Sequence, residues 1–283
     1  MAVAIEAYGA IEAREVIGAE LHRRFISYLD VRPKTAQGYD RALRPFFLYL
    51  SQRGISHPTR EDVIAYKETA RLHLKDTSLR AYMQAVKLFF KWTEEEGIYK
   101  NVAGRVKSEP VETEHRRLHL TAEQVRQVLA NIDRSSVVGK RDYAILSLMA
   151  TSGLRTIEVS RADIGDMKGL EGETALYVQG KGRSAKLEPV KVDPLVKAAI
   201  EDYMKTRRPG GADEPLFTSE SGNSKGGRMT TRSISRIAKD RMMAAGYDSD
   251  KWTAHSLRHT AATLNLLNGG TLQETQQLLR HKN

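Results

Sequence analysis

The chain has 283 residues, enough for about two domains of ~150 residues, which excludes a miniature scaffold held together by disulfides or a metal. It contains no cysteine, so disulfide bonds, thiolate zinc sites and cysteine nucleophiles are excluded as well. With 45 Lys and Arg against 35 Asp and Glu, the formal net charge of +10 favours a polyanionic partner such as nucleic acid, with a soluble basic enzyme as the alternative.

The first hundred residues predict four consecutive amphipathic helices, because apolar residues recur there at the helical period. Thr59 with Asp62 predicts a capping box at the start of the third helix. The fourth is expected to begin at an Asp76/Thr77 cap and to end at Gly97. We therefore expect an all-helical domain over residues 1–100, whose cations off the apolar stripes are candidate DNA contacts: Arg41, Arg44, Lys87 and Lys91.

Residues 101–118 mix glycine, proline and charges without sustained periodicity, which predicts a linker between two domains. Residues 119–283 then predict a second, mostly helical domain. Thr121 and Gln124 mark the start of its first helix as a capping box. No stretch reaches the ~18 apolar residues of a membrane span, and the N-terminus lacks the basic start of a secretory signal, so we expect a cytoplasmic protein without membrane contact.

Two short β-rich runs interrupt the helices of the second half. Residues 174–179 and 187–192 flank the sequence GKGRSAK, which predicts an antiparallel hairpin with a basic tip. The densest basic patch follows at residues 225–241, where Arg232 and Arg236 fall near one face of an expected helix. A DNA contact and a solvated helix face are the two interpretations of this patch.

Four short motifs in the second half carry residues suited to phosphate chemistry. They are GLRTIEV with Arg155 and Glu158, GKG with Lys181, HSLRH with His255 and Arg258, and LLRH with His281. In order and spacing these motifs resemble the tyrosine recombinase family of phage integrases and Xer-like proteins. The resemblance implies a mainly α protein, in which a four-helix, SAM-like core-binding domain precedes a mostly helical catalytic domain with a small antiparallel sheet.

Two arginines of these motifs fit the physical demands of phosphate chemistry. Attack on a phosphodiester concentrates negative charge on the phosphate oxygens, and fixed cations must stabilise that charge where no metal does so. A guanidinium suits the task because it is permanently charged and presents a planar fork of donors. We therefore predict that Arg155 and Arg258 clamp one phosphate, with an ion-paired surface arginine as the alternative for each taken alone.

The resemblance also implies a proton donor on the basic hairpin tip. Lys181 is expected to enter the minor groove and to protonate the departing 5′ oxygen, which requires an amine whose pKa the site can lower. Arg183 and Lys186 lie on the same tip and are the alternatives for reading the groove.

The resemblance assigns supporting roles to three further residues. His255, three residues before Arg258, is expected to donate to a phosphate oxygen or to move protons. His281 is expected to contact the same phosphate. Glu158, one turn after Arg155, is expected to orient its neighbours, with an ordinary surface ion pair as the alternative.

The family's nucleophile is a tyrosine that lies beyond the histidine matching His281, and thus beyond Asn283. All eleven tyrosines of the chain precede His255, the last being Tyr247. We therefore expect residues 1–283 to bind DNA without cleaving it. The family reaction passes through a 3′-phosphotyrosyl intermediate that retains the bond energy, so neither ATP nor a metal is required and no cofactor is expected.

The expected function is site-specific recombination of double-stranded DNA, for integration or excision. The family expectation is a dimer on one recombination site and a tetramer in the synaptic complex, with phosphate contacts providing most of the affinity. Two alternatives use a similar scaffold: a non-enzymatic DNA-binding regulator and a type IB topoisomerase. The set of two arginines, a lysine and two histidines favours an enzyme over a regulator, and the small helical first domain favours a recombinase over a topoisomerase.

Overall fold

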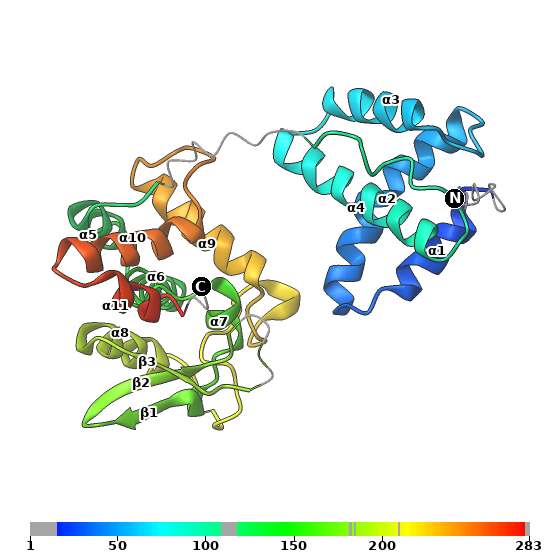
Figure 1. The fold of residues 1–283 in the computed structure, drawn as a ribbon. Helices are drawn as coiled ribbons and strands as arrows, with labels where there is room; N and C mark the ends of the chain where they lie inside the picture. The colour runs from blue at the N-terminus through cyan, green and yellow to red at the C-terminus, as the bar shows by residue number, and fades with distance from the viewer. Residues whose placement is uncertain (1–15, 109–117, 181–182, 184, 209, 281–283) are drawn as a thin grey trace, which may run out of the picture. The chain divides into compact units, whose positions relative to one another are not determined.

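The computed structural model describes residues 16–108, 118–180, 183, 185–208 and 210–280. The chain divides into two compact units, Met1–His115 and Arg116–Asn283 (Figure 1). Each unit has a hydrophobic core of its own. Helices dominate both units, and the described strands form one small sheet. The predicted mainly α class is therefore confirmed. No helix in the described segments is both long enough and apolar enough to cross a membrane.

The described part of the first unit contains the four predicted helices. Their apolar stripes meet in a core rich in aromatic rings, where Phe46, Phe89 and Phe90 are fully buried. Phe89 and Phe90 pack edge to face, with ring centroids 5.2 Å apart. The helices are α1 (Ala19–Tyr28), α2 (Pro33–Gln52), α3 (Arg60–Arg71) and α4 (Asp76–Glu95).

Short-range sequence signals mark several helix ends in this unit. The Asp62 amide donates to Thr59 Oγ1 at 3.3 Å and the Thr59 amide donates to Asp62 Oδ2 at 2.8 Å, so the predicted capping box is confirmed. Gly97 follows α4 with φ +65°, a left-handed conformation that glycine adopts without strain. The predicted cap at Asp76 is wrong: Lys75 is the N-cap without a side-chain hydrogen bond, and the Asp76 carboxylate instead adds negative charge to the first turn.

The segment after α4 packs back onto the first core. Val102, Ala103 and Val106 are buried in it, although residue 101 was the expected start of the linker. The segment forms neither a helix nor a strand, so the tertiary contact is what assigns these residues to the first unit.

The second unit is built around one central helix, α6, which packs against α8 and α10 (Figure 1). Apolar residues such as Ala144, Ile145 and Leu148 are fully buried there, which explains the nearly continuous apolar run in its sequence. Thr121 and Gln124 form the predicted capping box at the start of α5. The helices of this unit are α5 (Ala122–Ala130), α6 (Val137–Ser152), α7 (Thr156–Arg161), η1 (Ile164–Asp166), α8 (Pro194–Met204), η2 (Gly222–Ser224), α9 (Thr231–Ala244), α10 (Ala254–Leu267) and α11 (Leu272–Leu278).

A three-stranded antiparallel sheet flanks these helices, in the order β1 (Met167–Leu170), β2 (Glu173–Val178) and β3 (Glu188–Lys191). Leu176 in the middle strand lies opposite Met167 on one side and Val190 on the other. The predicted hairpin is formed by β2 and β3. β1 was not predicted, because most of its residues are exposed and its sequence lacks the alternation that marks a half-buried strand.

Candidate functional site

Arg155 lies where α6 ends and α7 begins. Gly153 ends α6 with φ +59°, and a Cβ at this position would lie 2.9 Å from Leu279 Cδ2. Glycine therefore permits both the left-handed turn and the close approach of the chain after α11. Arg155 then takes the N-cap position of α7 in an extended conformation, and its side chain remains 26% exposed.

Glu158 holds Arg155 through both its backbone and its side chain. The Arg155 amide donates to Glu158 Oε2 at 2.8 Å, and Arg155 Nη1 donates to Glu158 Oε1 at 2.9 Å. The Glu158 side chain is fully buried. A buried carboxylate is stable only when it is paired and hydrogen-bonded, so this contact is part of the core and not an ordinary surface pair.

Arg258 connects three segments that are distant in the sequence. It lies on α10 and is 2% exposed. Its Nη1 donates to the Gly153 carbonyl and its Nη2 donates to the Leu279 carbonyl. Burial, followed by the neighbouring charges of Arg155 and Arg280, lowers the pKa of Arg258 to about 10. These two contacts use two of the five N–H donors of the guanidinium and hold the side chain in place.

A third arginine, Arg280, completes the cluster and was missed by the sequence reasoning. Its Nη2 donates to Glu158 Oε2 at 2.9 Å, and its Nη1 donates to the Leu278 carbonyl at 2.7 Å. The only signal in the sequence was its position directly before His281 in the LLRH motif. The arginine cluster, defined as Arg155, Arg258 and Arg280 around Glu158, is therefore assembled from α7, α10 and the residues after α11.

The charges of the arginine cluster do not balance. Three guanidinium groups surround Glu158, the carboxylate to which Arg155 and Arg280 both donate. Burial lowers the pKa of Arg258 most, and the like charges of Arg155 and Arg280 lower it further. An oxyanion next to the exposed part of Arg155 would relieve this repulsion, so the geometry suits a phosphate group.

The histidine and lysine positions of the motifs are placed only in part. His255 lies in the first turn of α10, one turn before Arg258, and is exposed. Its ring packs edge to face on His259, with centroids 4.6 Å apart. Lys181 and His281 lie outside the described residues.

The two other cations of the hairpin tip bind carboxylates of their own unit. Arg183 Nη2 lies 2.9 Å from Glu188 Oε1. Lys186 Nζ donates to Asp163 and Asp166. Burial lowers the pKa of Lys186, but these carboxylates outweigh it and raise the pKa overall. A groove contact by Lys186 would require it to leave both carboxylates.

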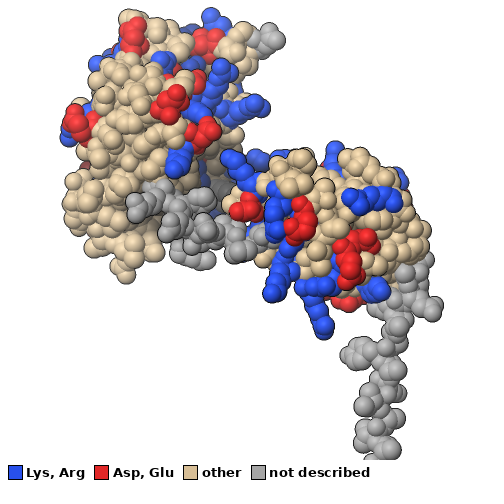
Figure 2. All heavy atoms as spheres, turned by 90° about the horizontal axis from the view of Figure 1, so that it is seen from above, with Lys and Arg blue, Asp and Glu red and all other residues tan. Residues whose placement is uncertain are grey.

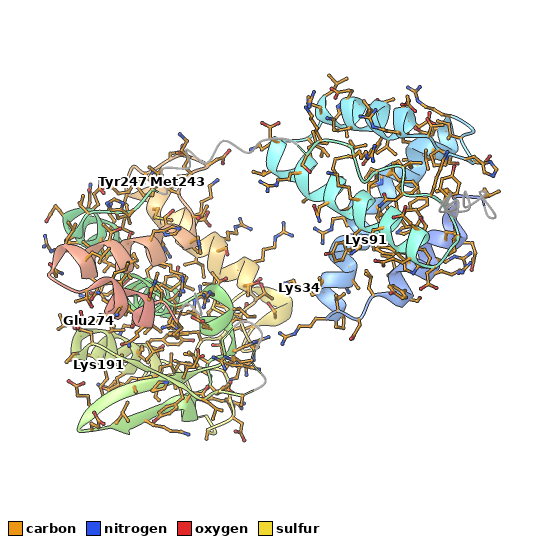
Figure 3. All side chains as sticks on the ribbon, viewed as in Figure 1. Lys34, Lys91, Lys191, Met243, Tyr247 and Glu274 are labelled. Atoms are coloured by element: carbon orange, nitrogen blue, oxygen red, sulfur yellow. The ribbon has the colours of Figure 1, made fainter. Side chains whose placement is uncertain are left out.

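The remaining candidate DNA contacts lie on helix surfaces. Figure 2 shows Lys and Arg side chains interspersed with acidic ones over the visible face of both units. Arg44 lies 2.5 Å from Asp40, Lys91 (Figure 3) lies 3.5 Å from Glu95, and Arg236 lies 3.5 Å from Asp240. Exposed pairs of this kind contribute little stability, so these cations can exchange their partners for phosphates. The other members of this set are Arg41 and Arg232, both exposed, and Lys87, whose Nζ donates to Ser108 Oγ at 2.9 Å.

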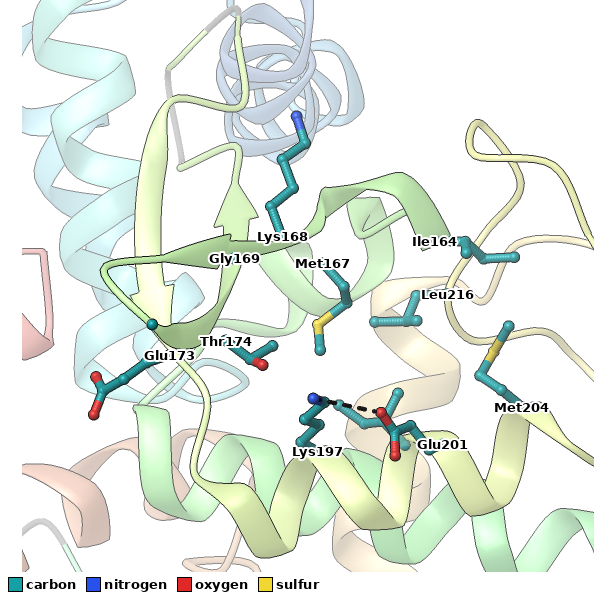
Figure 4. Close-up of a pocket in the computed structure, with 12 residues that line it drawn as sticks. Ile164, Met167, Lys168, Gly169, Glu173, Thr174, Lys197, Glu201, Met204 and Leu216 are labelled. Atoms are coloured by element: carbon teal, nitrogen blue, oxygen red, sulfur yellow. Dashed lines mark ion pairs between the residues drawn. The ribbon is translucent and has the colours of Figure 1, made fainter.

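The second unit also carries a cavity of about 550 Å³ between β1, β2 and α8 (Figure 4). Met167 and Leu216 form apolar parts of its wall, and Lys197 Nζ lies 3.7 Å from Glu201 Oε1 at its edge. Its described lining contains none of the residues predicted from the motifs. The arginine cluster is therefore a site of a different kind, made of charged side chains and not of an apolar hollow.

The fold and the arginine cluster together define a two-unit helical protein equipped to bind an oxyanion. The model of the phage integrase family matches residues 119–283, and the model of the N-terminal SAM-like domain of phage integrases matches residues 23–97. The chain belongs to the phage integrase family, and the predicted resemblance is confirmed.

Curated relatives and solved structures agree with this assignment. Tyrosine recombinase XerC of Haemophilus influenzae is 30% identical over 92% of this chain and 88% of its own length. A tyrosine recombinase of Synechococcus elongatus is 27% identical over 88% of this chain and 81% of its own length. A lambda integrase dimer bound to a COC′ core site matches with a TM-score of 0.74 and 18% identity, covering 93% of this chain and 94% of that one. The XerH recombinase bound to difH in a post-cleavage complex matches with a TM-score of 0.71 and 19% identity, over 88% and 74%. These structural likenesses show a shared fold.

Proposed function

We propose that this chain is a site-specific recombinase of the tyrosine type that acts on double-stranded DNA in the cytoplasm. The observation that carries the proposal is the arginine cluster, in which distant segments bring Arg155, Arg258 and Arg280 around the buried Glu158. Membership of the phage integrase family gives this cluster its substrate, a phosphate of the DNA backbone.

Arg155 makes the first contact with the scissile phosphate. Its side chain is 26% exposed, and among the contacts of the described residues its guanidinium donates only through Nη1, to Glu158. Arg258 lies behind it and adds positive charge from a buried position, where charge interactions are screened less than in water. Both charges stabilise the negative charge that develops on the phosphate oxygens during attack.

The other motif residues complete the reaction. Lys181 protonates the departing 5′ oxygen, and His255 and His281 donate to the phosphate. Attack by a tyrosine hydroxyl forms a bond to phosphorus and breaks the bond to the 5′ oxygen, leaving a 3′-phosphotyrosyl link. The free 5′ hydroxyl of the partner strand then attacks this link and releases the tyrosine.

Assembly on DNA follows the same reasoning. The structural neighbours include a lambda integrase dimer on a core site and a lambda integrase tetramer bound to a Holliday junction. By analogy, we propose that this chain binds one site as a dimer and joins two sites as a tetramer. The surface cations of both units provide phosphate contacts, which makes binding depend strongly on salt.

Selection of DNA tests the proposed function directly. The 283-residue chain is mixed with a pool of duplexes that carry a randomised segment, and bound duplexes are recovered and sequenced through several rounds. We expect a recurring site, whose enrichment falls when Arg155→Ala is used in the selection and is retained when Arg208→Ala, at an exposed position, is used as the control. A pool that shows no enrichment would overturn the proposal.

The tyrosines of the chain lead to a second test. Tyr247 (Figure 3) is engaged by its own unit, because its hydroxyl donates to Gln127 Oε1 at 2.9 Å and its ring packs on Trp252. We therefore expect Tyr247 to form no covalent bond with a nicked suicide duplex of the selected site. A protein–DNA band in a denaturing gel, abolished by Tyr247→Phe, would contradict this expectation.

A further inference from the structure

The backbone of Arg280 adopts a conformation that favours glycine. Its φ is +51°, and Glu171 is the other described non-glycine residue with a positive φ. Glu171 lies in the exposed turn between β1 and β2, where little fixes its side chain. A non-glycine residue outside such a turn keeps a positive φ when its surroundings hold it there, and the contacts of the Arg280 side chain show what does so.

The Arg280 side chain is anchored on protein acceptors. It is 9% exposed, and Nη1 donates to the Leu278 carbonyl at 2.7 Å. Nη2 donates to Glu158 Oε2 at 2.9 Å and lies 3.3 Å from the Gly153 carbonyl. Both terminal nitrogens therefore have protein partners, which sets Arg280 apart from the partly exposed Arg155. This geometry suits a residue that holds its neighbours in place.

The carboxylate of Glu158 is divided between the two arginines. Oε1 accepts from Arg155 Nη1, and Oε2 accepts from the Arg155 amide and from Arg280 Nη2. An arginine and a carboxylate left to themselves favour a bidentate pair, in which two guanidinium nitrogens meet both oxygens. Arg280 occupies the oxygen that such a pair would need.

We propose that Arg280 is a positioning residue: it engages Glu158 Oε2, so that Arg155 is held through one terminal nitrogen and keeps its other donors for the DNA phosphate. This inference deepens the proposed function and rests on it for the identity of the phosphate. Arg280 also joins the end of α11 to the start of α7, because it contacts Leu278, Gly153 and Glu158 together.

The first arm of the test uses the free protein and so does not depend on DNA. Nitrogen-15 spectra record the arginine side-chain resonances, and Arg155→Lys assigns the signal of Arg155. In Arg280→Met, which removes the charge, we expect the Arg155 signal to shift as its guanidinium turns toward both oxygens of Glu158. Arg280→Lys restores one cation near Oε2 and should return the signal toward its original position. An unchanged Arg155 signal in folded Arg280→Met would overturn the proposal.

The second arm measures affinity for the selected duplex. We expect Arg280→Met to weaken binding about fivefold, the size of one misplaced charge-assisted hydrogen bond, and to have no further effect when Arg155 is already alanine. Equal losses in both backgrounds would show a merely structural role and overturn the proposal. If Arg155→Ala itself leaves the affinity unchanged, the proposed phosphate contact fails, while the spectra still decide the role of Arg280.

Glu171→Gly and Arg280→Gly provide matched controls for backbone strain. Both substitutions relieve a positive φ, but only the second removes a contact to Glu158. We expect both variants to fold and only Arg280→Gly to shift the Arg155 signal and weaken binding. A shift of the same size in Glu171→Gly would attribute the effect to the backbone and contradict the proposal.

Discussion

The two units of the molecule bury different kinds of side chain. In the described first unit, the core consists of aliphatic and aromatic residues, and Thr93 is the polar residue buried with them. The second unit buries charged groups as well, including Arg141, Asp142, Glu158 and Arg258. The first unit is therefore stabilised mainly by apolar packing, whereas the second depends in addition on ion pairs that fail if one partner is lost.

Under the proposed function, this difference matches a first unit that holds DNA and a second unit that acts on it. A unit that only presents surface cations needs a rigid apolar core beneath them. A unit that stabilises a transition state needs charges fixed in a place with little water, and burial supplies that place. The chain has two tryptophans, Trp92 in the first core and Trp252 near Tyr247, so Trp92→Phe and Trp252→Phe backgrounds let fluorescence follow each unit separately.

The largest expected effect is at Asp142, which binds two arginines. Its Oδ1 lies 2.7 Å from Arg141 Nη2, and its Oδ2 lies 2.6 Å from Arg241 Nη2. Asp142→Asn leaves both guanidiniums without a counter-charge and should lower the free energy of unfolding of the second unit by about 3–5 kcal/mol. Urea unfolding followed at Trp252 measures this loss. A loss under about 1 kcal/mol would show that the two ion pairs of Asp142 stabilise the unit no more than exposed pairs do.

The matching change in the first unit is Phe89→Ala. Phe89 is fully buried and packs against Phe25 and Trp92, with centroid distances of 5.6 and 5.9 Å. Removing the ring should cost about 3–5 kcal/mol through lost burial and the cavity left behind. Urea unfolding at Trp92 reports the loss, and the transition at Trp252 should not move. A shift of both transitions by equal amounts would mean that the units unfold as one.

Gly153→Ala tests the turn on which the arginine cluster is built. Alanine at φ +59° costs about 1–2 kcal/mol, and its Cβ would also press on Leu279 Cδ2, which lies 2.9 Å away. Gly97→Ala is the matched control, because it has φ +65° and nothing within 4 Å of the added atom. We expect similar thermal destabilisation from the backbone term in both variants and a loss of duplex binding only in Gly153→Ala. Equal duplex binding by the two variants would show that the turn at Gly153 does not support the arginine cluster.

The smallest expected effect on stability is at Arg236. Its side chain is 82% exposed, and its ion pair with Asp240 contributes little. Arg236→Ala should change stability by less than about 0.5 kcal/mol, yet weaken duplex binding and reduce the salt slope by about one counterion. Fluorescence anisotropy at several salt concentrations measures the affinity for the duplex and its salt slope. An unchanged salt slope would show that Arg236 does not contact a DNA phosphate.

The fold was predictable where local patterns determine structure. The apolar stripes of α2 and α4 repeat at the helical period, and the capping boxes at Thr59 and Thr121 join residues three positions apart. Strand β1 could not be predicted, because its residues are mostly exposed and it forms by pairing with β2 in the folded sheet.

The sequence by itself determined the helical class, the two-part organisation and the motif residues Arg155, Glu158 and Arg258, because periodicity and motif order are properties of neighbouring residues. Tertiary structure alone decided what these residues touch. Arg258 meets Gly153 across 105 positions of the chain, and Arg280 meets Glu158 across 122. Such contacts arise when α10 packs against α6 and α11, and when α7 follows the turn that ends α6. No local pattern therefore specified that a third guanidinium would share the buried carboxylate.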